Sequence, residues 1–115
     1  MKNEKQHWTN GLPAGITVCD TEGIITEMNN AAGKVFEKYG GTQLIGKNVL
    51  DCHPEPSKTQ LKNMLEKPAL NAYTIEKNGQ KKLIYQCPWY ENDEFKGFVE
   101  LSLPIPAEMP HFIRK

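Results

Sequence analysis

The sequence lacks the features that would commit it to a membrane or to nucleic acid. Its longest apolar runs are three or four residues, whereas a helix that spans a bilayer needs about 20. The stretch from Met1 to Gly15 is polar and has no signal-peptide core. Lys and Arg together number 14, as do Asp and Glu. The chain therefore lacks the excess of positive charge that binding to a nucleic-acid phosphate backbone requires. We therefore expect a cytoplasmic protein with neither a membrane nor a nucleic-acid partner.

Cysteines are few and catalytic motifs are missing. The 3 cysteines, Cys19, Cys52 and Cys87, are odd in number and far apart in sequence. This argues against a disulfide framework and fits a reducing compartment. The chain has no CxxC or HExxH spacing, no phosphate loop and no nucleophile elbow. Its 115 residues leave room for one domain, which we do not expect to be an enzyme.

The sequence does contain short strands joined by turn residues. Strands are predicted at residues 15–20, 24–28, 71–76, 82–90 and 95–103. Asp20 to Gly23 has turn chemistry, and Asn78-Gly79 is a strong hairpin turn. Pro88 predicts a sheet edge or a bulge, because proline has no N–H to donate to a neighbouring strand.

Two helices are predicted between the second and third strands. Asn29 or Asn30 is a suitable N-cap for a helix that runs to Tyr39. The apolar face of this helix consists of Ala32, Val35, Phe36 and Tyr39. Glycine and prolines break residues 43–56, so that stretch holds only single helical turns.

The second helix begins at Ser57, which forms a capping box with Gln60, and it ends before Pro68. Its buried face consists of Leu61, Met64 and Leu65. Residues 1–11 are polar apart from Trp8 and predict a short N-terminal helix. The element order predicts an α+β fold, a five-stranded antiparallel sheet with its helices inserted after the second strand.

This order of elements, with these residues, resembles the PAS domain, the small sensory module of signalling proteins. The motifs that carry the resemblance are Ile16–Asp20, Glu22–Ile25, Met28–Ala32, Leu44–Asp51, His53–Glu55 and Gly97–Glu100. The resemblance implies the strand order 2-1-5-4-3. It also implies a PAS domain at residues 12–106, a helical flank at 1–11 and a tail at 107–115.

The resemblance further implies a sensory or signalling role, in which a small ligand or cofactor binds between the sheet and the helices. The resemblance implies these pocket candidates: Val49, Cys52, His53, Leu61, Met64, Leu65, Thr74 and Tyr85. Gln86 is an alternative on the same strand as Tyr85, because a bulge near Pro88 reverses which side chains face inward.

Two cofactor hypotheses follow from the resemblance. His53 is a candidate haem or metal ligand, although haem-binding relatives usually use a histidine within the long helix, and residues 57–66 contain none. A flavin adduct is not expected, because the light-sensing branch places its cysteine directly after Gly-x-Asn. Here Val49 follows Gly46-Lys47-Asn48, and Cys52 comes three residues late.

Three functions remain open from the sequence. The first is a ligand sensor, and the second is an interaction module whose pocket is filled by its own side chains. The third is a small enzyme on a similar fold. The family often dimerises through a helix before the first strand, which here is Glu4 to Asn10, so Trp8 and Leu12 are the interface candidates. The expected partners are a second copy of the chain or a separate signalling protein.

Overall fold

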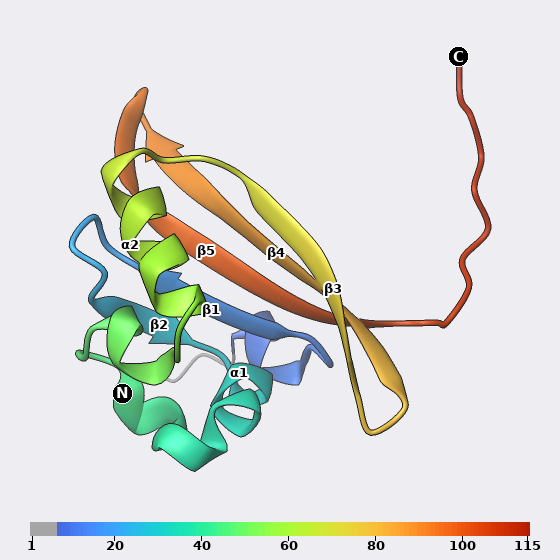
Figure 1. Ribbon diagram of the computed structural model, residues 1–115, viewed down its shortest axis with the longest axis horizontal. Helices are drawn as coiled ribbons and strands as arrows, with labels where there is room; N and C mark the ends of the chain where they lie inside the picture. Colours follow the sequence, from blue (N-terminus) through green and yellow to red (C-terminus); the bar gives the residue numbers. More distant parts are fainter. Residues whose placement is uncertain (1–6) are drawn as a thin grey trace.

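The computed structural model describes residues 7–115 of the chain (Figure 1). Its strands are β1 (Gly15–Cys19), β2 (Ile25–Met28), β3 (Asn71–Lys77), β4 (Gln80–Glu91) and β5 (Glu94–Ile105). Its α-helices are α1 (Asn30–Val35) and α2 (Ser57–Glu66). Its 3₁₀ turns are η1 (Trp8–Gly11), η2 (Glu37–Tyr39), η3 (Gly41–Leu44) and η4 (Val49–Cys52). The first part of the predicted N-terminal helix lies outside the described residues, and the rest is the turn η1.

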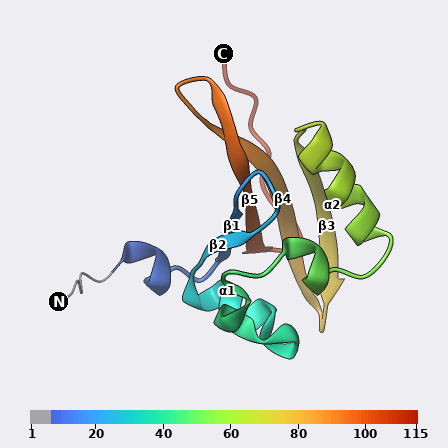
Figure 2. The same cartoon turned by 90° about the vertical axis from the view of Figure 1, so that its left-hand side faces the viewer.

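The strands form one antiparallel sheet in the order β2-β1-β5-β4-β3. The α-helices and 3₁₀ turns η2 to η4 are inserted between β2 and β3. Both features confirm the predicted fold class. Helix α2 lies against one face of the sheet, and the opposite face carries no α-helix of the described residues (Figure 2). No helix in residues 7–115 is long and apolar enough to span a membrane.

Strand alternation divides the sheet into an inner face toward α2 and an outer face. The buried residues of the inner face include Thr17, Cys19, Ile84, Gln86, Phe98 and Ser102. The half-buried apolar residues of the opposite side form what we call the outer apolar face: Ile16, Val18, Leu83, Tyr85, Leu101 and Leu103. Leu101 pairs with Ile16 on β1 and with Tyr85 on β4, so this apolar face is continuous across three strands.

Both hairpins that build β3 to β5 have two-residue turns. Asn78 and Gly79 adopt φ values of 53° and 78°, and Asn92 and Asp93 adopt 53° and 65°. Asparagine, aspartate and glycine tolerate this left-handed conformation best, and its twist matches that of the flanking strands. The predicted Asn78-Gly79 turn is therefore confirmed, and its cause is the backbone preference of these two residues.

Prolines lie within two strands where one edge has no neighbour. Pro88 is two residues beyond Gln86, the last β4 residue that pairs with β3, and a bulge follows between Trp89 and Tyr90. Pro104 is likewise two residues beyond Ser102, the last β5 residue that pairs with β1. β5 therefore continues to Ile105, two residues past its predicted end.

Two predictions about the helices were wrong in detail. Helix α1 ends at Val35, which is itself 39% exposed, and not at Tyr39. The 3₁₀ turn that follows changes the direction of the later side chains, and Tyr39 is 47% exposed. Ser57 does not form a capping box, because it is already helical and the N-cap is Pro56. Instead the Glu55 carboxylate accepts hydrogen bonds from the Thr59 N–H (3.1 Å) and hydroxyl (2.7 Å).

A single buried side chain, Asn29, fastens the start of the domain. Its Oδ1 accepts from the N–H groups of Ile16 and Ala32, both at 2.9 Å. Its Nδ2 donates to the carbonyls of Thr9 (2.7 Å) and Ala14 (2.8 Å). Asn29 is thus the N-cap of α1 and also holds β1 and η1 in place. Asn29 is 4% exposed, and its bonds to Ala14 and Ala32 are buried, which protects them from competing water.

The close approach of β1 and β5 requires a glycine. Gly97 has a φ of 148°, and a Cβ on it would collide with the backbone carbonyl of Cys19. A side chain here would therefore force the two central strands apart.

Asn29→Ala is expected to lower the free energy of unfolding by roughly 2–4 kcal/mol, because it removes an N-cap and leaves buried backbone groups unpaired. Urea unfolding followed by circular dichroism measures the change. Asn30→Ala is the matched control: its side chain is exposed and donates a single longer bond, 3.3 Å, to the Asn10 carbonyl. It should cost less than about 1 kcal/mol. Equal losses in both variants would contradict the role given to Asn29.

Candidate functional site

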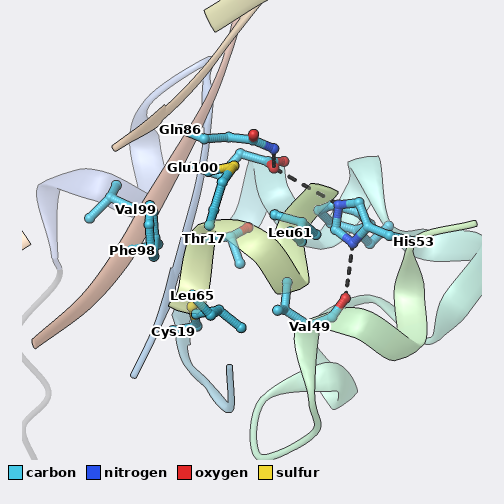
Figure 3. Close-up of a pocket in the computed structure, with 12 residues that line it drawn as sticks. Thr17, Cys19, Val49, His53, Leu61, Leu65, Gln86, Phe98, Val99 and Glu100 are labelled. Atoms are coloured by element: carbon cyan, nitrogen blue, oxygen red, sulfur yellow. Dashed lines mark hydrogen bonds and ion pairs between the residues drawn. The ribbon is translucent and has the colours of Figure 1, made fainter. Parts of the chain in front are cut away.

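A pocket lies between the inner face of the sheet and the helical layer (Figure 3). Strands β1, β4 and β5 form one wall. Helix α2, Val49 of η4, and two residues that directly follow a helix or turn, Phe36 after α1 and His53 after η4, form the other. The lining residues are Thr17, Cys19, Phe36, Val49, His53, Leu61, Met64, Leu65, Gln86, Phe98, Val99 and Glu100. Apolar side chains dominate this set, and Met64 packs with Cys19 and Phe98 at its centre.

The free space inside the pocket is small. Its volume is about 30 Å³, whereas one water needs about 10–15 Å³ on this measure. Pockets that hold organic ligands typically have about 300–1,000 Å³. As the side chains stand, the pocket therefore has room for about two or three waters and not for a cofactor.

A chain of polar groups crosses the pocket from the helical layer to the sheet. The His53 Nδ1–H donates to the Val49 carbonyl at 2.9 Å, because a carbonyl oxygen can only accept. The Nε2 of His53 lies 3.9 Å from the Glu100 carboxylate, and their side chains are only 12% and 18% exposed. Figure 3 shows both contacts as dashed lines. His53 thereby connects η4 to the central strand β5.

The same carboxylate continues the chain across the sheet. Gln86 Nε2 donates to Glu100 Oε1 at 2.8 Å, and Asn71 Nδ2 donates to Gln86 Oε1 at 2.8 Å. The side-chain amide of Gln86 thus donates its N–H to Glu100 on β5, and its oxygen accepts from Asn71 on β3. Polar groups on three adjacent strands are linked, and this satisfies a carboxylate that burial would otherwise penalise.

Two titratable groups on the inner face are less acidic than usual. Burial raises the pKa of the Cys19 thiol, and a hydrogen bond from the backbone N–H of Phe98 offsets only part of this rise. Burial, and then the Glu100 carboxylate, raise the pKa of Tyr73. Because a buried protonated thiol is a poor nucleophile, Cys19 serves the core as a small apolar side chain.

The structure brings most of the predicted pocket residues together. Val49, His53, Leu61, Met64 and Leu65 all line the cavity. The side chain of Cys52 lies outside the described part of the structure.

Thr74 and Tyr85 were wrongly predicted to line the pocket, because both lie on the other face of the sheet. Gln86 is buried and lines the pocket, and its neighbour Tyr85 must then point outward. Thr74 pairs with Leu83, also on the outer face, and is exposed.

Sequence reasoning missed Thr17, Cys19, Phe98, Val99 and Glu100 as lining residues. Glu100 had the clearest available signal, since it is a lone charge within the apolar run of the last strand. A charge at such a position indicates either an exposed face or a buried polar partner, and the structure shows the second.

The geometry does not fit the predicted haem or metal role of His53. A macrocycle needs far more space than about 30 Å³, and Nε2 of His53 is directed at Glu100. Among the described side chains, no group of three His, Cys, Asp or Glu residues comes close enough to hold a metal ion.

The two interface candidates have different surroundings. Trp8 lies on η1 and is 71% exposed. Leu12 is half-buried in a surface hollow beside α1.

Comparison with known proteins agrees with this architecture. A family model described as PAS fold matches residues 9–72, more than half of the chain. The comparison with curated proteins found no match to this chain. Among solved structures, a C-terminal domain from Streptococcus mutans has a TM-score of 0.69 at 20% identity, covering 84% of this chain and 79% of that one.

Two further structures share the fold at low identity. The PAS domain of Bordetella pertussis BvgS has a TM-score of 0.61 at 19% identity, covering 87% of this chain and 82% of that one. The Aer2 receptor from Vibrio cholerae, a dual PAS-heme oxygen sensor, has a TM-score of 0.60 at 16% identity, covering 81% of this chain and 95% of that one. The matched family model, the sheet order and the inserted helices agree, and the chain belongs to the PAS fold family.

Proposed function

We propose that the chain is a cytoplasmic signalling module that acts through protein contacts and has no catalytic activity of its own. Its core is filled by its own side chains, and its outer apolar face receives a second copy of the chain. Membership of the PAS fold family and the sensor proteins among its structural neighbours support the signalling role.

The observation that carries this proposal is the small volume of the inner pocket. About 30 Å³ is free between α2 and the sheet, because Met64, Leu61 and Phe98 occupy the space that a ligand would need. A pocket of this size transmits no ligand signal unless its walls first move apart.

The outer apolar face supports the choice of a second copy as the partner. Side chains on β1, β4 and β5 form a continuous apolar surface without a covering α-helix among the described residues. Trp8 lies on η1, shortly before β1 in the chain, and is largely exposed (71%). In a two-fold dimer the Trp8 of each copy can cover the outer face of the other, since one patch meets the same patch.

A second candidate, a ligand sensor, is favoured by the polar chain from His53 to Gln86. A small guest that separated the two layers would break the 3.9 Å contact between His53 and Glu100. The binding state would then reach β5 and, through it, the outer face. The Aer2 receptor is a haem sensor on this fold, although the geometry at His53 of the present chain does not suit haem.

Met64→Ala is expected to cost roughly 2–5 kcal/mol of unfolding free energy, because it opens a cavity in a filled core. Benzene should then raise the melting temperature of Met64→Ala and leave the wild type unchanged. Val35→Ala is the control, since Val35 is apolar but 39% exposed, and it should cost less than about 1 kcal/mol. A wild-type protein that benzene stabilises as much as the variant would contradict a filled core.

An absorption spectrum across the ultraviolet and visible range, before and after adding haemin, separates the two candidates further. We expect no band beyond the protein absorption and no Soret band with haemin. A Soret band that disappears in His53→Ala would overturn the filled-core proposal and establish a haem sensor.

Leu101→Asp is expected to convert a dimer into a monomer, because it places a charge at the centre of the outer apolar face. Light scattering coupled to size-exclusion chromatography measures the mass. Ile45→Asp is the matched control, since Ile45 is an exposed apolar residue (44%) between η3 and η4, and it should remain dimeric. Circular dichroism checks that both variants fold. A wild-type monomer at high concentration would rule out this dimer.

A further inference from the structure

We propose that a groove lined by lysines, on the edge of the molecule where α1 meets the β3–β4 turn, binds an acidic segment of a partner protein. This lysine groove is a hollow of about 370 Å³ lined by Lys34, Val35, Lys77, Asn78, Gln80 and Lys82. It is separate from both the inner pocket and the outer apolar face.

Helix α1 and the β3–β4 hairpin, which are distant in sequence, place the lysines around this hollow. Lys34 is in the last turn of α1, Lys77 ends β3, and Lys82 lies near the start of β4. The alternation that turns Ile84 and Gln86 inward puts Lys82 on the same face, directed toward the helical layer. Figure 1 shows α1 and the β3–β4 turn at the same end of the molecule.

A second hollow extends the groove along the surface. It has a volume of about 430 Å³, shares Lys34, Val35 and Lys82 with the first, and continues to the Asn10–Gly15 segment. Two adjoining hollows suit an extended peptide better than a single anion.

The charge of the groove has no counterpart on its walls. No Asp or Glu lines either hollow among the described residues, although the whole chain has equal numbers of acidic and basic side chains. None of the three lysines forms an ion pair with a described residue. Three ammonium groups around a concave surface raise the local concentration of anions.

The walls between the lysines are apolar, which favours a peptide over nucleic acid. Val35 is 39% exposed, and Leu12 and Pro104 line the extension. An acidic segment with interspersed apolar side chains can pair with the amines and cover these walls. A nucleic-acid backbone has no apolar groups to cover these walls, and its binding requires more positive charge than three lysines supply.

The experiment is a fluorescence anisotropy titration of the full chain with a short labelled peptide of glutamates interrupted by leucines. The wild type should bind it, and Lys34→Glu/Lys82→Glu should weaken binding about tenfold or more. Lys58→Glu/Lys62→Glu on α2 makes the same change in net charge at exposed positions outside the groove, and should bind within about twofold of wild type. Lys34→Gln/Lys82→Gln serves if the charge reversal unfolds the protein, and should also weaken binding.

Three results would overturn the proposal. One is no binding by the wild type, and another is equal loss in the groove and α2 variants, which would indicate only a general charge effect. The third is tighter binding of a single-stranded oligonucleotide of matched charge. Leu101→Asp should bind the peptide as the wild type does, so loss of the proposed dimer and failure of the lysine groove remain distinguishable.

Discussion

The four hydrogen bonds of the Asn29 side chain are the constraint on which the arrangement of this domain depends. One buried amide fixes the start of β1, the start of α1 and the segment that enters from η1. Because β1 lies between β2 and β5, its position also sets where the sheet presents its inner face. The glycine at position 97 completes this arrangement, since it lets β5 approach the β1 backbone closely enough to pair.

With these elements in place, the two layers meet over a core that leaves little room. Apolar side chains from α2 and β5 fill most of the pocket, and His53, Glu100 and Gln86 connect the layers through polar contacts. Breaking this polar chain leaves a buried carboxylate without partners, which is costly. These polar contacts hold the two layers together, and the surfaces that we propose for partners, the outer apolar face and the lysine groove, lie outside the core.

Much of the fold could be predicted because its signals are local. Asn78-Gly79 specifies a tight hairpin by its own backbone preferences, and the Asn29 side chain caps a helix by accepting from an N–H only three residues away. Leu61, Met64 and Leu65 share one helix face by spacing alone. The predictions that were wrong depended on neighbours: Tyr39 is exposed because the chain changes to a 3₁₀ turn after α1, and Ser57 is already helical while the Glu55 carboxylate accepts from the Thr59 N–H.

The sequence alone determined the element order, the turns, the antiparallel sheet with inserted helices and the helix face that meets the sheet. It did not determine which face of β4 lies inward, because an alternating strand looks the same from either side until a second layer covers it. The tertiary structure placed Gln86 inside and Tyr85 and Thr74 outside, and it brought Glu100 to His53. It also decided how much space remained, since the volume of a pocket depends on how side chains from distant segments interlock and not on which residues are present.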